Sequence, residues 1–243
     1  MILVPTAPAA HLAFDLAAWA AGLGLGLVLY RWRLREATQR LAVSTGPGYV
    51  AALAVGAVAG AWAAGSLNTL QGPSPALSHS IVGALVGAIA AVEAYKLARR
   101  VKGSTGAVFV GPFALGAVIG RWGCLFAGLP DRTYGTPTSL PWAVDLGDRV
   151  GRHPVQVYES LAMAAFLAVF LIGLKRRSDW TIRRGFYVMC VWYAAQRFAW
   201  EFFKPYPPVL GPLNLFHLLC LALGTYGLVF LALDRRRERL ARP

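Results

Sequence analysis

The chain alternates between long apolar stretches and shorter segments that are rich in polar and basic residues. Seven of the apolar stretches are close to the ~20 residues that a helix needs to cross a bilayer. They lie near residues 12–30, 48–66, 80–98, 108–127, 157–174, 186–203 and 211–233. This pattern predicts an all-α polytopic membrane protein, with seven transmembrane helices in a single integral membrane domain over residues 1–243. No basic residue precedes the first stretch, so it lacks the charged start of a cleavable signal peptide, and we expect it to remain in the mature protein.

The composition excludes the main alternative classes of protein. Hydrophobic residues make up 57% of the chain and charged residues only 14%, whereas a soluble domain carries about a quarter charged residues. A soluble enzyme, a disordered chain and a disulfide scaffold are therefore excluded. The three cysteines, Cys124, Cys190 and Cys220, lie in or at the ends of apolar stretches and have no metal-ligand spacing. We interpret Cys190 and Cys220 as small buried hydrophobic residues.

Lysine and arginine are concentrated on one side of the predicted membrane. The first, third and fifth loops and the C-terminal tail together hold eighteen of them, and the N-terminal segment and the other loops hold four. Because basic residues accumulate on the cytoplasmic side, the N-terminus is predicted to face out and the C-terminus to face in. The net charge of +13 is then mainly a topology signal with some attraction to anionic lipid head groups. Nucleic-acid binding is not expected.

Two further arginines, Arg121 and Arg197, lie inside predicted spans. At about 1.5 Å per residue, each is roughly 9 Å below the outer surface. A charge at this depth is costly and points to function by default, and two guanidinium groups at one depth suit a phosphate-bearing ligand from the outer leaflet. The alternative is that each arginine pairs with a nearby acid and holds helices together, as Glu201, one helical turn from Arg197, would allow.

Other polar residues gather close to these arginines. Tyr193, Arg197, Glu201 and Lys204 recur at helical spacing. They form one polar stripe, which we expect to face a cavity or the bundle interior. The outer loop at 129–156 is the longest and is rich in glycine and proline. Its length suits a lid or a partly re-entrant segment, and a plain connector is the alternative.

All four histidines fall at or near the outer ends of predicted spans, where any of them can take up a proton near neutral pH. They are His11, His79, His153 and His217. For any single one, a helix-end or hydrogen-bonding role is favoured over catalysis. Asp15 is expected to orient His11, and Glu93 is expected to have a structural partner. The histidines have no ligand spacing, and no glycine-rich phosphate loop follows a strand, so neither a metal nor a nucleotide cofactor is expected.

Several separated motifs together give the chain a family resemblance. They are GRWGCLF at 120–126, YGTP at 134–137, PW at 141–142, RHPVQVYE at 152–159 and YAAQRFAWEF at 193–202. In this order they resemble the prolipoprotein diacylglyceryl transferases of bacterial inner membranes, over about residues 80–225 and with the same seven-span plan. The resemblance implies a transferase that moves diacylglyceryl from phosphatidylglycerol to the lipobox cysteine thiol of a prolipoprotein and releases glycerol 1-phosphate. With the predicted topology and the depth of the two arginines, the site is expected to open to the outer leaflet of the inner membrane.

The resemblance assigns roles to particular residues. Arg121 matches the arginine of the family's G-R-x-G-N-F signature, and Arg197 matches that of its Y-G-x-x-R-F motif, which begins here at Tyr193. Both would hold the phosphate and offset the charge that develops on the leaving group. Four more residues match polar positions of the same pocket, namely Gln156, Tyr158, Glu159 and Glu201.

Three departures from the family pattern indicate a divergent branch. The signature asparagine is Cys124, the acid expected five residues later is Leu129, and the histidine of the H-G-G-L-x-G motif is Val82. That histidine is a candidate base, so His79 or His153 would help to deprotonate the acceptor thiol in its place. These departures bear on the identity of the acceptor and of the base more than on the identity of the lipid donor.

Three functions stay open on the sequence alone. The leading hypothesis is the lipoprotein reaction, in an outer-facing pocket between the fourth and sixth spans. A second hypothesis keeps the donor and transfers to a sugar, a polyol or another lipid. A third is a non-catalytic lipid-binding membrane protein that has kept the fold and the arginines.

Overall fold

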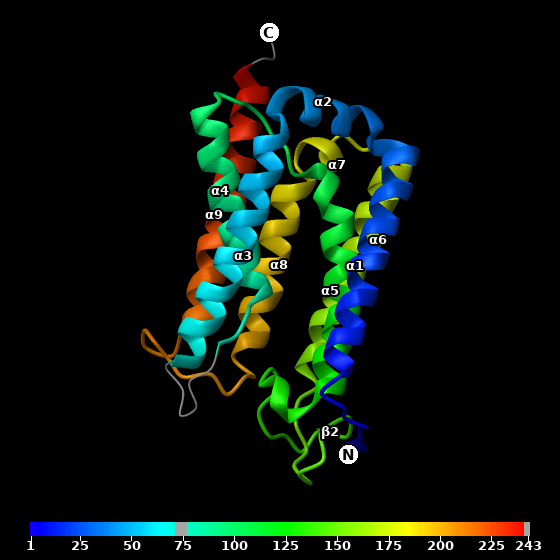
Figure 1. Ribbon diagram of the computed structural model, residues 1–243, viewed down its shortest axis with the longest axis vertical. Coiled ribbons are helices and arrows are strands. Elements are labelled where there is room, and N and C mark those ends of the chain that lie inside the picture. Colours follow the sequence, from blue (N-terminus) through cyan, green and yellow to red (C-terminus); the bar gives the residue numbers. More distant parts are fainter. Residues whose placement is uncertain (71–76, 241–243) are drawn as a thin grey trace.

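The computed structural model describes residues 1–70 and 77–240, and nearly all of its regular elements are helices (Figure 1). The long helices are α1 (Ala10–Leu29), α3 (Pro47–Leu70), α4 (Ile81–Ala98), α5 (Ala107–Ala127), α6 (Val155–Lys175), α8 (Gly185–Glu201) and α9 (Leu215–Leu240). The shorter elements are a π-helix η1 (Tyr30–Leu34), α2 (Arg35–Thr45), a 3-10 turn η2 (Leu129–Asp131), α7 (Trp180–Arg183) and the strands β1 (Ile2–Leu3) and β2 (Val144–Asp145). The predicted all-α architecture is confirmed.

Six helical stretches among the described residues are long and apolar enough to cross a membrane. They are Ala10–Thr45, Pro47–Leu70, Ile81–Ala98, Ala107–Ala127, Val155–Lys175 and Leu215–Arg236. The multi-pass architecture is confirmed. The sixth predicted span corresponds to α8, which has 17 residues and runs alongside the others, so the count of seven stays a prediction. The start of α1 and the end of α9 lie at opposite ends of the bundle, as an odd number of crossings requires, and which end faces out also stays a prediction (Figure 1).

Two boundaries differ from the prediction. The segment after the first span, expected to be a loop, continues as η1 and α2, and α2 lies across the end of the bundle (Figure 1). Helix α9 begins at Leu215 because Asn214 caps it, its Oδ1 accepting a hydrogen bond from the His217 N–H at 3.0 Å.

The side chains of Arg237, Arg239 and Arg242, which contribute to the orientation prediction, lie outside the described residues.

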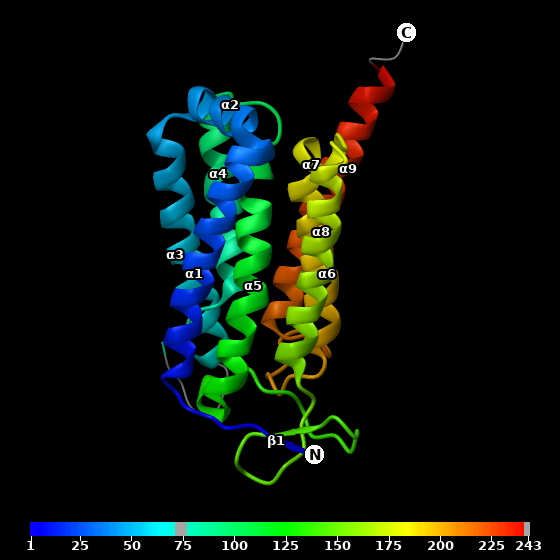
Figure 2. The same ribbon diagram turned by 90° about the vertical axis from the view of Figure 1, so that its right-hand side faces the viewer.

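The long helices are arranged in two layers (Figure 2). One contains α1, α3, α4 and α5, and the other contains α6, α8 and α9, with α5 packed against α6 between them. Helices α3 and α4 approach so closely that a side chain at Gly60 or Gly87 would collide with the backbone of the facing helix. Val82, at the position of the family histidine, is fully buried in the hydrophobic core. This part of the motif therefore serves helix packing.

The N-terminal segment and the predicted outer loop fold together at one end of the bundle. Strand β1 pairs in parallel with β2, placing Ile2 opposite Val144 and Leu3 opposite Asp145. A small hydrophobic core lies beneath this pairing and contains Val4, Leu125, Val144 and Leu146. The loop thus lies beyond the ends of α5 and α6 as a folded segment (Figure 2).

Candidate functional site

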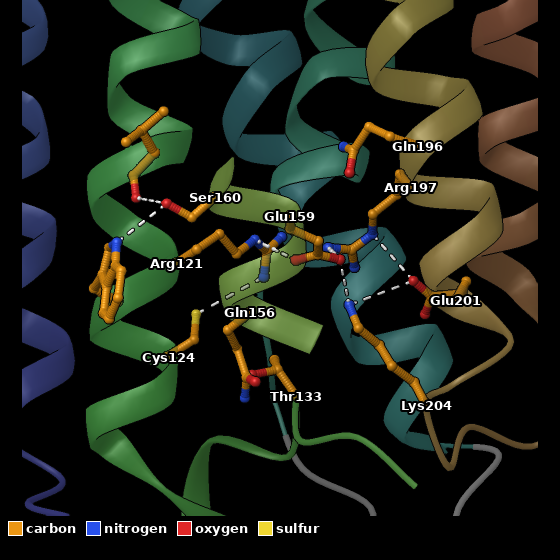
Figure 3. Close-up of polar contacts among 12 residues, drawn as sticks. Arg121, Cys124, Thr133, Gln156, Glu159, Ser160, Gln196, Arg197, Glu201 and Lys204 are labelled. Carbon is orange, nitrogen blue, oxygen red and sulfur yellow. Dashed lines mark hydrogen bonds and ion pairs between the residues drawn. The ribbon is translucent and has the colours of Figure 1, made fainter. Parts of the chain in front are cut away.

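A buried cluster of charges centres on the carboxylate of Glu159 on α6 (Figure 3). Arg121 Nε on α5 lies 2.7 Å from Glu159 Oε2. Arg197 Nη1 on α8 donates to Glu159 Oε1 at 2.9 Å, and Lys204 Nζ donates to the same oxygen at 2.8 Å. Glu201 Oε2 lies 3.1 Å from Arg197 Nε and 3.5 Å from Lys204 Nζ. These five residues, called the Glu159 cluster below, join three helices.

The Glu159 cluster contains more positive than negative charge. All five side chains are buried, and the most exposed, Arg121, is only 10% accessible. Every cation contacts a carboxylate, but three cations share two carboxylates, so the cluster has a net charge of +1 when all five groups are ionised. Because an uncompensated charge is costly at this depth, the cluster favours an additional anionic group.

Local structure places these side chains on facing surfaces. Ser160, next to Glu159, accepts a hydrogen bond from Trp122 Nε1 at 3.1 Å and donates to the Val118 carbonyl at 2.8 Å. These bonds hold α5 and α6 in register beside Arg121. Helix α8 ends at Glu201, and a turn in which the Lys204 N–H donates to the Glu201 carbonyl at 3.1 Å brings Lys204 back to the cluster.

The two sequence interpretations of the arginines meet in this cluster. The expected pairing of Arg197 with Glu201 is present. In addition, Arg121 and Arg197 share Glu159, so the two guanidinium groups at similar predicted depth do converge. Lys204 belongs to the predicted polar stripe but not to the predicted site residues. Its helical spacing from Glu201 was the signal that could have identified it.

A second polar group lies beside Arg121. Arg121 Nη1 donates to Cys124 Sγ at 3.8 Å, and His11 Nε2 lies 3.8 Å from the same sulfur and 3.1 Å from Asp131 Oδ1. The expected contact of His11 with Asp15 is present, at 3.0 Å. Burial disfavours the charge on Asp131, but hydrogen bonds from His11 and Thr133 outweigh this effect and hold the pKa of Asp131 below its ordinary value.

Asp131 was missed because the acid was expected at position 129. The 3-10 turn η2 follows α5, and it brings Asp131, two residues further along, to His11. The side chain of Gln156, a predicted site residue, donates to Thr133 Oγ1 at 3.5 Å. Gln156 therefore lies between the outer loop and the Glu159 cluster (Figure 3).

The candidate bases lie in different surroundings. The exposed His79 lies beside His11, with ring centroids 5.9 Å apart. His153 packs on the ring of Phe203 at 4.8 Å and lies 6.4 Å from that of Tyr158. Tyr158 in turn accepts a hydrogen bond from Trp142 Nε1 at 2.8 Å. The structure thus places His79 beside the His11 group and His153 in an aromatic group.

The fourth histidine has a structural environment. His217 is 1% exposed at the start of α9, and its Nδ1 accepts a hydrogen bond from the Asn214 N–H at 3.1 Å. Its ring packs on Phe198 and Phe202, with centroid distances of 4.8 and 4.3 Å. This is the helix-end role that the sequence analysis favoured for a histidine at this position.

An apolar cavity of about 290 Å³ lies inside the bundle, with Glu93 on its wall, and none of the five residues of the Glu159 cluster lines it. It is bounded by α3, α4, α5, α8 and α9, and Phe113 on its wall contacts the Tyr193 ring at a centroid distance of 5.3 Å. Among the described residues, the buried Tyr193 hydroxyl and the Gln196 Oε1 have no hydrogen-bond partner. A ligand with a polar head and an apolar tail would satisfy both environments.

The geometry suits binding of a phosphate group. A guanidinium has five N–H donors, and in Arg121 and Arg197 the contacts described above involve only Nε and Nη1. The remaining donors can bind phosphate oxygens. Positive charge fixed in a buried site stabilises negative charge that develops on a leaving group.

The family model and the curated relatives that match this chain point to the same protein family. The model of the family described as prolipoprotein diacylglyceryl transferase matches residues 17–233. Three curated relatives are named phosphatidylglycerol–prolipoprotein diacylglyceryl transferase. That of Methylococcus capsulatus is 32% identical over 62% of this chain and 59% of its own length. That of Bacillus cytotoxicus is 30% identical over 70% and 64%, and that of Finegoldia magna is 31% identical over 50% and 47%.

The extent of these matches is limited. The chain spans about half to two thirds of the length of the curated relatives that it matches. No solved structure matches the chain.

Proposed function

The chain belongs to the prolipoprotein diacylglyceryl transferase family, and on that premise we propose that it is a transferase that uses phosphatidylglycerol. It moves the diacylglyceryl group to the cysteine thiol of a prolipoprotein and releases glycerol 1-phosphate. The observation that carries this proposal is the convergence of Arg121 and Arg197, together with Lys204, on the single carboxylate of Glu159. An apolar cavity, whose wall residue Phe113 contacts Tyr193, can take part of an acyl chain.

The proposed reaction is a displacement at a glycerol carbon. The bond between this carbon and the phosphate oxygen breaks, and the oxygen keeps the electron pair. A carbon–sulfur bond forms to the acceptor cysteine, whose proton passes to a base. Arg121 and Arg197 hold the phosphate and offset the charge on the departing oxygen, while Glu159 and Glu201 orient the two guanidinium groups.

The base is proposed to be His79 or His153, since position 82 holds valine. A thiol with an ordinary pKa of about 8.5 needs only modest help to lose its proton near neutral pH. We propose that Tyr158 and Gln156 shape the entrance, because Tyr158 contacts Trp142 of the outer loop and Gln156 contacts Thr133. Cys124 and Tyr193 border the phosphate site, beside Arg121 and Phe113.

The proposed location follows from the distribution of lysine and arginine between the two ends of the bundle. We propose that this multi-pass protein lies in the bacterial cytoplasmic (inner) membrane and that the Glu159 cluster opens to the outer leaflet. The outer loop lies at the end of the bundle with the fewer basic residues, and Glu159 lies near the start of α6, which follows this loop. The acceptor would be the lipobox segment of a prolipoprotein, and the donor an anionic phospholipid.

The test uses purified protein in phosphatidylglycerol vesicles, with and without a lipobox peptide, and follows the release of water-soluble glycerophosphate. Release that depends on the peptide is expected, and Arg121→Ala or Arg197→Ala is expected to abolish it. Arg40→Ala is the matched control, because this α2 arginine is 72% exposed and pairs only with exposed Glu36 among the described residues. Wild-type turnover in both site variants would overturn the mechanism.

A different acceptor is the second candidate function. It is favoured by the full burial of Val82 in the core at the position of the family histidine, which marks the acceptor side of the reaction as altered. Transfer to a sugar, a polyol or another lipid then replaces transfer to a thiol. Release of glycerophosphate without the peptide would support this candidate, and binding of lipid without any release would point to a non-catalytic protein.

A further inference from the structure

Three segments that are distant in the sequence bring a nitrogen, a sulfur and an oxygen ligand together. His11 lies in the first turn of α1, Cys124 in the last turn of α5, and Asp131 at the end of η2. Their ligand atoms all lie within 4.8 Å of one another. We propose that His11, Cys124 and Asp131 form a binding site for a divalent transition-metal ion of the zinc class. This proposal does not depend on the proposed function.

The distances between the ligand atoms fit such an ion. In a tetrahedral zinc site, typical bond lengths place the histidine nitrogen about 3.5 Å from the cysteine sulfur and about 3.4 Å from a carboxylate oxygen. The corresponding distances here are 3.8 Å from His11 Nε2 to Cys124 Sγ and 3.1 Å from His11 Nε2 to Asp131 Oδ1. The third pair, Cys124 Sγ and the Asp131 oxygen, lies within 4.8 Å, so rotation of these side chains would be needed to bring all three atoms to one ion.

Contacts behind the ligands also fit a metal site. A histidine that binds a metal through one nitrogen almost always donates its other N–H to a carboxylate, carbonyl or water. Here His11 Nδ1 lies 3.0 Å from Asp15 Oδ2, which leaves Nε2 for the ion. The second oxygen of Asp131 accepts a hydrogen bond from Thr133, and Arg121 Nη1 lies 3.8 Å from Cys124 Sγ.

The chemistry of the ligands selects the kind of ion. A thiolate and an imidazole are poor ligands for Mg²⁺ and Ca²⁺, which prefer oxygen. One nitrogen, one sulfur and one oxygen suit Zn²⁺ and leave a fourth tetrahedral position for water or an added thiol. The cysteine that completes this set stands where the resembling family has an asparagine, so the departure at position 124 supplies the soft ligand.

Spacing along the chain does not predict this site. His11 and Cys124 are 113 residues apart, and only the packing of α1 against α5 brings them together. The alternative to a metal is a hydrogen-bonded network in which a protonated His11 bridges Asp15 and Asp131. The two arrangements differ in the role of Cys124, which is essential only to the metal site.

Cobalt binding tests the proposal. The protein, purified in detergent and freed of metal with a chelator, is titrated with Co²⁺ alone. We expect about one equivalent to bind, with visible absorption typical of tetrahedral Co²⁺ and a near-ultraviolet band from thiolate-to-cobalt charge transfer. Cys124→Ser should abolish that band, and Asp15→Asn should weaken binding by about 10- to 100-fold while leaving the band in place.

The matched control is Cys220→Ser, which changes a buried cysteine on α9, and it should bind Co²⁺ like the wild type. His11→Ala and Asp131→Asn provide second variants if Cys124→Ser does not fold, as judged by its melting temperature. Absence of bound Co²⁺ in the wild type would overturn the proposal. An unchanged charge-transfer band in folded Cys124→Ser would do the same.

Discussion

Two groups of charges in the part of the chain that the structure describes differ in their balance. In one, on the opposite half of the bundle, Lys96 Nζ on α4 donates to both oxygens of Glu93, at 2.9 and 3.1 Å, and Tyr226 on α9 donates to Glu93 Oε1 at 2.8 Å. This Glu93 pair has one cation and one anion. The Glu159 cluster has three cations and two anions, and it shares a single carboxylate among all three cations.

The difference separates a structural ion pair from a binding site. The charges of the Glu93 pair cancel each other, and its hydrogen bonds join α4 to α9, which is the structural role that the sequence analysis expected for Glu93. The Glu159 cluster gains from an added anion because its own charges do not cancel. Charge balance, more than depth in the membrane, therefore indicates which buried charges bind a ligand.

The largest effect is expected from removing one cation in each group. Arg197→Ala should lower glycerophosphate release by at least about 100-fold, because it removes donors that stabilise the leaving group. Lys96→Met should leave release close to that of the wild type, since this cation belongs to the Glu93 pair. Comparable losses in folded samples of both variants would show that charge balance does not distinguish the two groups.

Next in size is the effect of removing the shared carboxylate. Glu159→Gln leaves three buried cations facing only Glu201, so it should lower the free energy of unfolding by about 3–5 kcal/mol. Thermal unfolding in detergent measures this change. Added inorganic phosphate should raise the melting temperature of the variant more than that of the wild type, and an equal rise in both would contradict an excess of positive charge.

A smaller effect is expected from removing one cation of the Glu159 cluster so that its positive and negative charges are equal in number. Lys204→Met leaves two cations and two anions, so binding of phosphatidylglycerol should weaken by roughly tenfold, the value of one charge-assisted hydrogen bond. Titration calorimetry measures the binding of phosphatidylglycerol to the purified protein in detergent. Lys102→Met is a suitable comparison, since Lys102 is an exposed residue on the loop between α4 and α5. Equal affinity in both variants would remove Lys204 from the site.

The smallest effect is expected within the Glu93 pair. Glu93 is 28% exposed, so Glu93→Gln should cost only about 1 kcal/mol of stability. Combining it with Lys96→Met should recover part of the loss from Lys96→Met alone, because both charges are then removed. A double-mutant cycle on melting temperatures measures this coupling. Strictly additive losses would mean that the pair does not contribute to stability.

Some of this architecture was predictable because its signals are local. Apolar length identifies the helices, and an arginine within an apolar stretch stands out, as Arg121 and Arg197 do. The meeting of both arginines at Glu159 depends on how α5, α6 and α8 are rotated against one another, which spacing within one helix does not determine. The same limit explains why the contact of His11 with Asp131 was missed. Likewise, the basic composition of residues 35–45 predicts a loop, although α2 forms there and continues the helix from α1 and η1.

The parallel pairing of β1 with β2 has a consequence for the order of assembly. Residues 2–3 are synthesised before their partners at 144–145, which follow more than a hundred residues later, after α5. The N-terminal strand therefore cannot pair until the segment at 129–156 has reached the same side of the membrane. Contacts of such long sequence separation form late in folding. Closure of this end of the bundle would then be a late step of membrane insertion, which leaves the polar site open to water until α6 has followed.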